Sequence, residues 1–292
     1  MAAASLGKLQ KEKAAMIRGL LLGLKSRNAL ISERAARVLS NIPYALDTVI
    51  KELVADLKNI DENIQSNSAK ALGLIGETRE IEIVSLNQAL NDKNGTVRLT
   101  AAEALVKLGR SNQNVISGVL LMLEFGDDNG REKAAQILSE CWNERLLIKD
   151  ALFNSLKDQY FLVKLRSAEA LLRFGCYENE ARRVILDVLQ DKRFLVYERE
   201  KAGEILGKIG LTDNEVIYAL KHALKDNDRQ IGVRAANALI DLGRFDEKIL
   251  SVLIESLTVT SCIDEAAFAL GKLTDIRFSK LNVAHNIVDK EI

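Results

Sequence analysis

One pattern of small, apolar and polar residues recurs along the chain. The pattern begins with two small residues, a variable residue, a third small residue and an aliphatic residue. After two variable residues it ends with an aliphatic residue and usually glycine, as in AAEALVKLG (101–109) and AANALIDLG (235–243). The pattern occurs eight times, and its second small residues are Ala36, Ala69, Ala102, Ala135, Ala168, Ala202, Ala236 and Ala267. The steps between them are 33, 33, 33, 33, 34, 34 and 31 residues. A repeat this regular predicts an array of similar structural units.

Each unit predicts two helices. In the third copy, one helical face carries Val97, Ala101, Ala104, Leu105 and Leu108 at positions i, i+4, i+7, i+8 and i+11. Glycine suits a helix end, so we expect the closing glycine to end this second helix. A shorter apolar pattern predicts a first helix, as in 81–90, 181–190 and 214–224. Turns rich in Asp and Asn, which favour turns and N-caps, lie between the two helices at 91–96, 157–159, 190–193 and 225–230.

A single helical pair of this size cannot bury its own apolar face, so each pair must stack on the next. The sequence therefore predicts an all-α fold. We expect a right-handed α-α superhelix, an α-solenoid of about eight helical pairs of 31–34 residues. As one elongated domain, it would comprise an N-terminal cap at 1–14, the repeat solenoid at 15–274, and a C-terminal cap or partial repeat at 275–292.

The repeat resembles the HEAT repeat, and more narrowly the short HEAT-like repeat of phycobilisome lyases. The best copy runs from Asp92 through Val97-Arg98, Ala101-Ala102 and Ala104-Leu105 to Leu108-Gly109. Across about 15–274, the basic residue of the motif is kept as Arg98, Arg131 and Lys164, and the helix-starting proline frequent in such repeats is absent. The resemblance implies an armadillo/HEAT-like solenoid, a fold that serves many unrelated functions.

Composition agrees with helix and narrows the class of partner. The chain has one proline in 292 residues and 48% hydrophobic residues. Its 41 basic and 41 acidic residues give zero net charge, whereas a groove that binds nucleic acid has an excess of basic residues. The composition therefore argues against a nucleic-acid partner. No apolar run approaches the ~18 residues of a membrane span, and the first residues lack a signal-peptide pattern. Three cysteines without C-x-x-C spacing predict a reducing, cytoplasmic protein with inert thiols.

Residues suited to catalysis are sparse. Two histidines, His222 and His285, form no pattern with Ser, Cys or Glu that catalysis or metal binding would require. Phosphate-loop and dinucleotide-binding motifs are absent from the sequence. We therefore predict no enzyme activity, no cofactor and no metal site.

A first candidate site is the concave face, which second helices usually line in stacked helical pairs. The positions of these helices that face away from the core hold nine basic and six acidic residues. We predict a groove for an acidic or mixed-charge protein or peptide, with candidate residues Arg34, Arg37, Lys70, Lys107, Lys133, Arg166, Glu169, Arg173 and Arg234. The alternative is a solvated surface of ion pairs three and four residues apart, each worth only ~0.2–0.5 kcal/mol.

A second candidate site is an aromatic edge. Eight of the chain's 14 aromatic residues lie between 142 and 197. Two turns, 158–166 and 191–199, carry the apolar triplet Phe-Leu-Val where other turns are polar. The candidate residues are Trp142, Tyr160, Phe161, Phe194 and Tyr197, since exposed aromatics are typical of interaction surfaces. The alternative is that these side chains cover the core.

The fourth repeat departs from the pattern. Gly130 occupies the position of Val97, and Cys141-Trp142 replaces the closing Leu-Gly. This favours a local irregularity in the pitch of the solenoid over a hinge or a pocket around Trp142.

These patterns favour a non-catalytic scaffold or recognition module that binds another protein through the concave face. The alternative rests on the resemblance alone, which is also compatible with a phycobilin lyase or lyase subunit. In that case a linear tetrapyrrole would lie near the aromatic residues, with arginines pairing its propionates.

Overall fold

The computed structural model describes residues 2–42, 46–76 and 79–273, and helices are its only regular elements there. In chain order they are α1 (Ala2–Leu24), α2 (Ala29–Ser40), α3 (Leu46–Asp56), α4 (Glu62–Ile75), α5 (Glu80–Ala89), α6 (Gly95–Lys107), α7 (Gln113–Phe125), α8 (Asp128–Leu138), α9 (Arg145–Asn154), the short 3-10 helix η2 (Ser155–Lys157), α10 (Phe161–Phe174), α11 (Glu178–Gln190), α12 (Val196–Ile209), α13 (Asn214–Ala223), α14 (Arg229–Asp241) and α15 (Glu247–Ser256). A last helix covers 263–273. The predicted all-α solenoid of helical pairs is confirmed.

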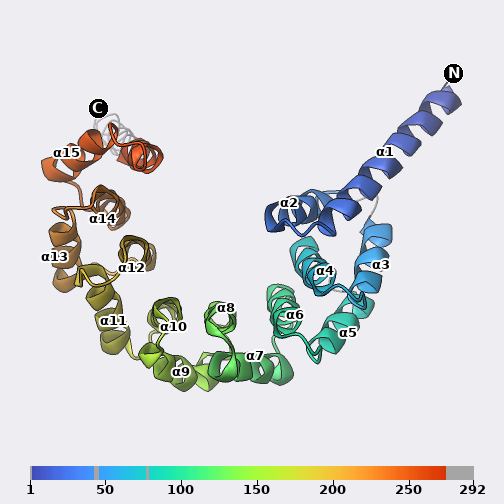
Figure 1. Cartoon of the computed structure of the whole chain (residues 1–292), viewed down its shortest axis with the longest axis horizontal. Helices are drawn as coiled ribbons and strands as arrows, with labels where there is room; N and C mark the ends of the chain where they lie inside the picture. Colours follow the sequence, from blue (N-terminus) through green and yellow to red (C-terminus); the bar gives the residue numbers. More distant parts are fainter. Residues whose placement is uncertain (1, 43–45, 77–78, 274–292) are drawn as a thin grey trace, which may run out of the picture. The chain divides into compact units, whose positions relative to one another are not determined.

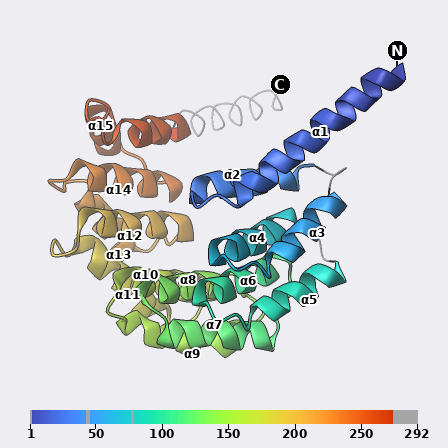
Figure 2. The ribbon, with the colours of Figure 1, turned by 45° about the vertical axis from the view of Figure 1, so that its right-hand side comes forward.

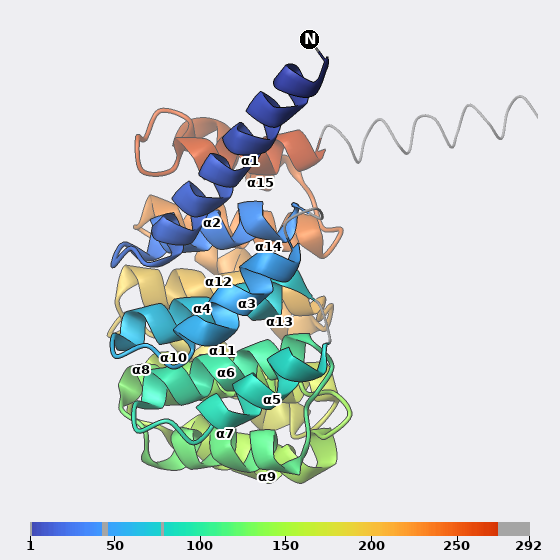
Figure 3. The same cartoon turned by 90° about the vertical axis from the view of Figure 1, so that its right-hand side faces the viewer.

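The chain forms two compact units, Met1–Ala151 and Leu152–Ile292, called unit 1 and unit 2 below. In unit 1 the second helices α2, α4, α6 and α8 pack side by side in one layer, and α3, α5 and α7 lie on the other side of them (Figure 1). Unit 2 repeats the arrangement, with α10, α12 and α14 in one layer and α11 and α13 in the other. The stacking of helix upon helix within each unit is clear in Figures 2 and 3.

Polar caps and glycines set the helix ends, as the sequence predicts. Asn94 precedes α6, and its Oδ1 accepts hydrogen bonds from the backbone N–H groups of Thr96 and Val97 at 2.8 and 3.3 Å. At the other end of α6, Gly109 has a φ of 67°, a left-handed conformation that glycine adopts without strain. The caps satisfy donors that the first turn of a helix leaves unpaired.

Small residues let neighbouring second helices approach closely. A Cβ atom added at Gly73 of α4 would lie 2.8 Å from Ala104 Cα of α6. In unit 2, a Cβ atom at Gly207 of α12 would lie 2.9 Å from Ala238 Cα of α14. Glycine is required at both positions because the obstacle is backbone, which cannot rotate away as a side chain can.

Two polar side chains tie a repeat to the following one. Gln65 Nε2 donates to the carbonyl of Leu57, at the end of the first helix of its own repeat, and to the Asp92 carboxylate in the next turn, at 3.1 and 3.2 Å. Arg199 does the same in unit 2. Its Nε donates to the Leu189 carbonyl at 2.9 Å, and its guanidinium pairs with Asp226 at 2.5 Å. Both partners of this ion pair are buried.

The basic residue of the repeat motif has a structural role in two copies. Arg98 Nη1 donates to the backbone carbonyls of Asp92 and Lys93 at 2.9 and 3.0 Å. Arg131 Nη1 donates to the Gly126 carbonyl at 2.9 Å. These arginines therefore satisfy carbonyls of the turn inside their own repeat.

The structure corrects two predicted boundaries. The turn expected at 158–166 ends at Tyr160, because α10 already begins at Phe161, and the turn expected at 191–199 ends at Leu195, because α12 begins at Val196. Phe161 and Val163 are buried, as in the alternative interpretation that these side chains cover the core. An apolar triplet can start a helix when its first turn faces a neighbouring helix, and sequence spacing alone does not show this.

The two predicted terminal caps are described only in part. Residues 2–14 are the first part of α1, which continues to Leu24, and the predicted cap at 275–292 lies outside the described residues.

In the fourth repeat, Gly130 is buried in α8, and its N–H donates to Asp127 Oδ1 at 2.7 Å. A Cβ atom at Gly130 would lie 2.8 Å from that oxygen. The missing side chain thus makes room for the cap of α8.

Candidate functional site

The second-helix layer of unit 1 carries two clusters in which one carboxylate pairs with two cations; such a cluster is called a hub below. In the first hub, Glu33 of α2 pairs with Arg37 of the same helix at 2.9 Å and with Lys70 of α4 at 3.0 Å. The hydrogen bonds from Arg37 and Lys70 lower the pKa of Glu33 to about 2. The carboxylate is therefore ionised at neutral pH and holds both cations in place.

The second hub of unit 1 joins α6 to α8. Glu103 of α6 pairs with Lys107 at 2.8 Å and with Lys133 of α8 at 2.7 Å. Burial opposes the charge on Glu103, but the hydrogen bonds from the two lysines outweigh it and lower the pKa. A buried carboxylate of this kind is stable only when it is paired.

Unit 2 contains two hubs that each lie on one helix. On α10, Glu169 pairs with Arg166 at 3.2 Å and with Arg173 at 2.8 Å. On α12, Glu204 accepts hydrogen bonds from Lys201 at 2.8 Å and from Lys208. Burial opposes the Glu204 charge, but the two lysines lower its pKa to about 2.

Each of the four hubs has a formal charge of +1, because it contains one carboxylate and two cations. In three of the hubs one cation is exposed to solvent: the side chains of Arg37, Arg173 and Lys208 are 68%, 47% and 55% exposed. Arg34 is also exposed, and within the described residues it forms no ion pair. The second-helix layers thus carry ion pairs three and four residues apart, as in the alternative of a solvated surface, but they also keep exposed cationic groups.

A hollow of about 220 Å³ lies between α12, α14 and the helix at 263–273 in unit 2. The ring of Phe268 lines it and is 61% exposed. Lys272 Nζ lies 4.9 Å from the centre of this ring and pairs with Asp241 at 2.6 Å and Asn237 at 2.9 Å. The hollow combines one apolar ring with both signs of charge.

Two carboxylates that interact with Arg234, a residue that lines this hollow, have raised pKa values. Burial raises the pKa of Glu200 and of Glu265, and neighbouring carboxylates add to the rise. Arg234, which pairs with Glu265 at 2.6 Å, opposes it. Arg234 is among the residues predicted from the sequence, whereas Phe268 and Lys272 are not. The signal available was that Phe268 is the one aromatic residue on the predicted stripe.

The predicted aromatic-edge residues divide between the two units, Trp142 in unit 1 and the other four in unit 2. In unit 2, Phe161 lies 5.4 Å from both Tyr160 and Tyr197 between ring centres, in edge-to-face geometry. Tyr197 is exposed, whereas Phe194 is half-buried and lines a separate cavity of about 620 Å³ with Lys164 and Arg193. Trp142, in unit 1, is exposed, with the Arg145 guanidinium 4.9 Å from its ring centre.

The potential metal ligands and the thiols of the described residues are separately accounted for. None of their His, Cys, Asp and Glu side chains gather in a group of three or more that could hold a metal ion. Cys141, Cys176 and Cys262 are free. Burial, assisted by Glu144 and Glu140, raises the pKa of the Cys141 thiol to about 12, which leaves it unreactive. No helix in the described part has both the length and the apolarity to cross a bilayer.

Comparison with known proteins gives structural neighbours. No protein-family model and no curated protein matches the chain. YibA of Escherichia coli is 24% identical, with 88% of this chain and 92% of that chain covered and a TM-score of 0.53. The complex of CpcE and CpcF of phycocyanin lyase from a Nostoc species is 16% identical, covers 85% and 93%, and has a TM-score of 0.50. Kap95p, from a structure with RanGDP, is 15% identical, covers 91% and 40%, and has a TM-score of 0.50.

At these identities the likeness is one of fold. It extends over 85% or more of this chain in all three comparisons. Together with the helical pairs described above, the comparisons confirm the sequence resemblance at the level of architecture: the chain folds as a HEAT-like α-solenoid.

Proposed function

We propose that this chain is a non-catalytic protein-binding module, and that the second-helix layers of its units recognise an acidic or mixed-charge protein surface or peptide. The observation that carries the proposal is the repetition of four hubs, each with one carboxylate, two cations and a formal charge of +1. A partner that presents carboxylates toward this layer would meet positive charge in each unit.

The hubs also lower the cost of binding. Each central carboxylate already fixes two long cationic side chains, so less rotamer entropy is lost when a partner arrives. The outward faces of Arg37 and Arg173 keep N–H donors for a partner's carboxylates, and such charge-assisted hydrogen bonds are among the stronger ones. Arg34 provides a further exposed guanidinium on α2.

Phe268 supplies the apolar anchor in unit 2. Its exposed ring beside Lys272 and Asp241 matches the common arrangement of a binding hot spot, an apolar centre with a polar rim. Two structural neighbours support this use of the fold, since Kap95p is described as binding RanGDP and CpcE as forming a complex with CpcF. A reducing, cytoplasmic setting, expected from the cysteines, forms part of the proposal.

A capture experiment tests the proposal. The bait variant replaces Arg34, Arg37, Arg173 and Lys208 by Gln, which leaves a second cation in each affected hub. The matched control makes the same charge change on exposed first-helix cations, at Lys51, Arg183, Lys221 and Lys248. We expect proteins retained by the native chain and the control to be lost from the bait variant, as read by mass spectrometry. Equal retention by all three baits would contradict the proposal.

The alternative, a tetrapyrrole lyase, can be tested directly by absorption spectroscopy. A tetrapyrrole lyase has to bind its bilin, and binding would shift and sharpen the visible absorption of the free pigment. Titration of biliverdin with the native chain should leave the spectrum unchanged if the chain is a protein-binding module. A saturable shift that is lost in Tyr197→Ala would instead favour the lyase.

A further inference from the structure

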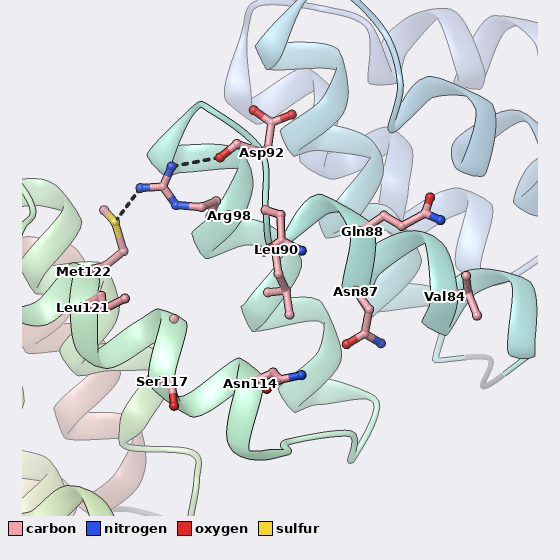
Figure 4. Close-up of a pocket in the computed structure, with 12 residues that line it drawn as sticks. Val84, Asn87, Gln88, Leu90, Asp92, Arg98, Asn114, Ser117, Leu121 and Met122 are labelled. Atoms are coloured by element: carbon pink, nitrogen blue, oxygen red, sulfur yellow. Dashed lines mark hydrogen bonds between the residues drawn. The ribbon is translucent and has the colours of Figure 1, made fainter.

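Within each unit, a repeat covers part of the repeat beside it. In the second-helix layer of unit 1, Ala104 of α6 packs on Gly73 of α4, and the same contact joins α12 to α14 in unit 2. On the first-helix side of unit 1, the Arg98 guanidinium donates to Met122 Sδ of the following repeat at 3.2 Å, and both residues line a groove of about 910 Å³ between α5 and α7 (Figure 4). A repeat with neighbours on both sides therefore buries surface that the first and the last repeat leave open.

Val38 of α2 occupies a position that is buried in the later second helices. It lies two residues after the second small residue of its repeat, as Ala104 does in α6, where that position packs on the preceding second helix. Val38 is 47% exposed. Its equivalents in six later second helices are at most 3% exposed: Ala71, Ala104, Ile137, Ala170, Ala238 and Ala269.

Ile31 shows the same difference nearer the start of α2. It is the third residue of its helix and is 49% exposed. The third residues of α6, α10 and α14, which are Val97, Val163 and Ile231, are fully buried. The outer repeats of a solenoid need a polar outer face for solubility. The aliphatic residues at these two positions of α2 therefore point to a packing partner.

The first and the last helical pair carry opposite charge. Residues 2–42, with α1 and α2, contain eight basic and two acidic residues, a formal charge of +6. Residues 246–273, with α15 and the helix at 263–273 (called the last helix below), contain two basic and five acidic residues, a formal charge of −3. A second α2 would bring like charges to the exposed face of α2, whereas the last helix of a second copy would bring the opposite charge.

Ion pairs between consecutive second helices define which positions meet. Glu33 lies three residues before the second small residue of its repeat, and it pairs at 3.0 Å with Lys70, which lies one residue after that of the next repeat. Arg234 and Glu265 each lie two residues before the second small residue of their repeats, and they pair at 2.6 Å. These two pairs fix the register in which one second helix stacks on the next.

The last helix has acids, and α2 has cations, at the positions that meet in this register. Asp264 and Glu265 lie three and two residues before the second small residue of the last repeat. Arg34 and Arg37 lie two residues before and one residue after that of the first. The same register between two copies places Asp264 opposite Arg37 and Glu265 opposite Arg34. Asp264 and Arg34 are exposed, and neither forms an ion pair within the part of the chain that the structure describes.

We infer that the last helix of one copy docks on α2 of a second copy, as one second helix docks on the next within a unit. Gly271, which has the place in the last helix that Gly73 has in α4, receives Val38, and the two acid–arginine pairs flank this contact. The two docking surfaces differ, so the contact is heterologous. Each added copy presents a further α2 and a further last helix, and assembly continues until a ring closes or an open chain forms.

Sedimentation velocity of the full chain over a concentration series tests the inference. We expect a mean mass above that of one chain, which rises with concentration and falls at high salt because exposed ion pairs are screened. Val38→Glu places a carboxylate in the contact, against the acids of the last helix, and should weaken association at least about tenfold. The matched control, Leu30→Glu, makes the same charge change at the second residue of α2, whose equivalents Asn63 and Thr96 are exposed. It should associate like the native chain.

A charge exchange between copies tests the register. Arg37→Glu and Asp264→Lys each put like charges opposite one another, so each variant alone should associate more weakly than the native chain. In an equal mixture, the altered α2 of one variant meets the altered last helix of the other, and the remaining contacts are native. Association should therefore return in the mixture, which an unfolded variant could not produce.

Three results would overturn the inference: a native chain that keeps the mass of one copy at every concentration, equal weakening by Leu30→Glu and Val38→Glu, or a mixture that stays as dissociated as its components. A fourth is a species that stops at two copies and is indifferent to Asp264→Lys, which would assign α2 to a contact with a second α2. Val38 and Asp264 belong to no hub, so capture of a partner by the second-helix layers should survive both changes. The inference and the proposed function therefore fail separately.

Discussion

The close contact between α4 and α6 predicts that Gly73→Ala destabilises unit 1. The added Cβ atom would lie 2.8 Å from Ala104 Cα and 3.0 Å from Ala104 Cβ. Real Cβ atoms do not approach backbone this closely, so the two helices must move apart. Separation loosens the packing of the whole layer, because each second helix contacts its neighbours along its length.

The expected size follows from two opposing effects. Replacing glycine by alanine in a helix interior stabilises the helix by roughly 0.5–1 kcal/mol. Overpacking of a dense contact costs about 1–3 kcal/mol. The net effect at Gly73 is therefore a loss of up to about 2.5 kcal/mol, centred at about 1 kcal/mol. Gly118→Ala in α7 brings the helix gain alone, since nothing lies within 4 Å of its added Cβ atom.

Urea unfolding followed by Trp142 fluorescence measures both variants, because this single tryptophan reports on unit 1. We expect the midpoint of Gly73→Ala to fall below that of the native chain and the midpoint of Gly118→Ala to rise above it. Gly207→Ala should repeat the loss in unit 2, where the obstacle is Ala238 Cα at 2.9 Å, as followed by circular dichroism. If Gly73→Ala is as stable as Gly118→Ala, the close-contact reasoning is wrong.

Three further predictions follow from the ion pairs and thiols. Arg199→Met should lower the free energy of unfolding by about 3–5 kcal/mol because it leaves Asp226 buried without its partner. Arg193→Met, which breaks an exposed pair, should change stability far less in the same denaturant titration, and equal losses would contradict the assignment. The hub carboxylates Glu33 and Glu204, with pKa values lowered from 4.5 to about 2, stabilise the fold when ionised, so stability should fall as the pH falls from about 4.5 to 2. Glu33→Gln with Glu204→Gln should flatten this slope in unfolding measured across that range, and an unchanged slope would show that the hubs do not carry it. Iodoacetamide at pH 8 should modify half-buried Cys176 before Cys141, whose pKa is raised to about 12; peptide mass mapping that finds Cys141 modified first would contradict its burial.

Periodicity was sufficient to predict the fold because every repeat obeys the same packing rule. The 33-residue spacing located the helical pairs, and the Asp and Asn residues located caps such as Asn94. The boundary of α10 was missed because the choice between a turn and a first helical turn at Phe161 depends on what the side chain packs against. That neighbour comes from another repeat, which spacing within one repeat does not reveal.

The sequence was sufficient to predict which residues share a helix face in the candidate site, but not which of them form ion pairs across helices. Helical spacing placed Arg166, Glu169 and Arg173 on one face, and the structure joins them in one hub. The hub around Glu33 needs Lys70 from the next second helix, so its geometry depends on how two repeats stack.

The side chains of Gln65 and Arg199 have a consequence for how the chain loses its structure. Each donates to a carbonyl of its own repeat and to an aspartate of the next, so fraying of one repeat withdraws a partner from the adjacent one. Nearest-neighbour terms of this kind raise the cooperativity of a repeat array. Proteases acting on the native chain should therefore release blocks of several repeats, with few cleavage products that correspond to single helical pairs.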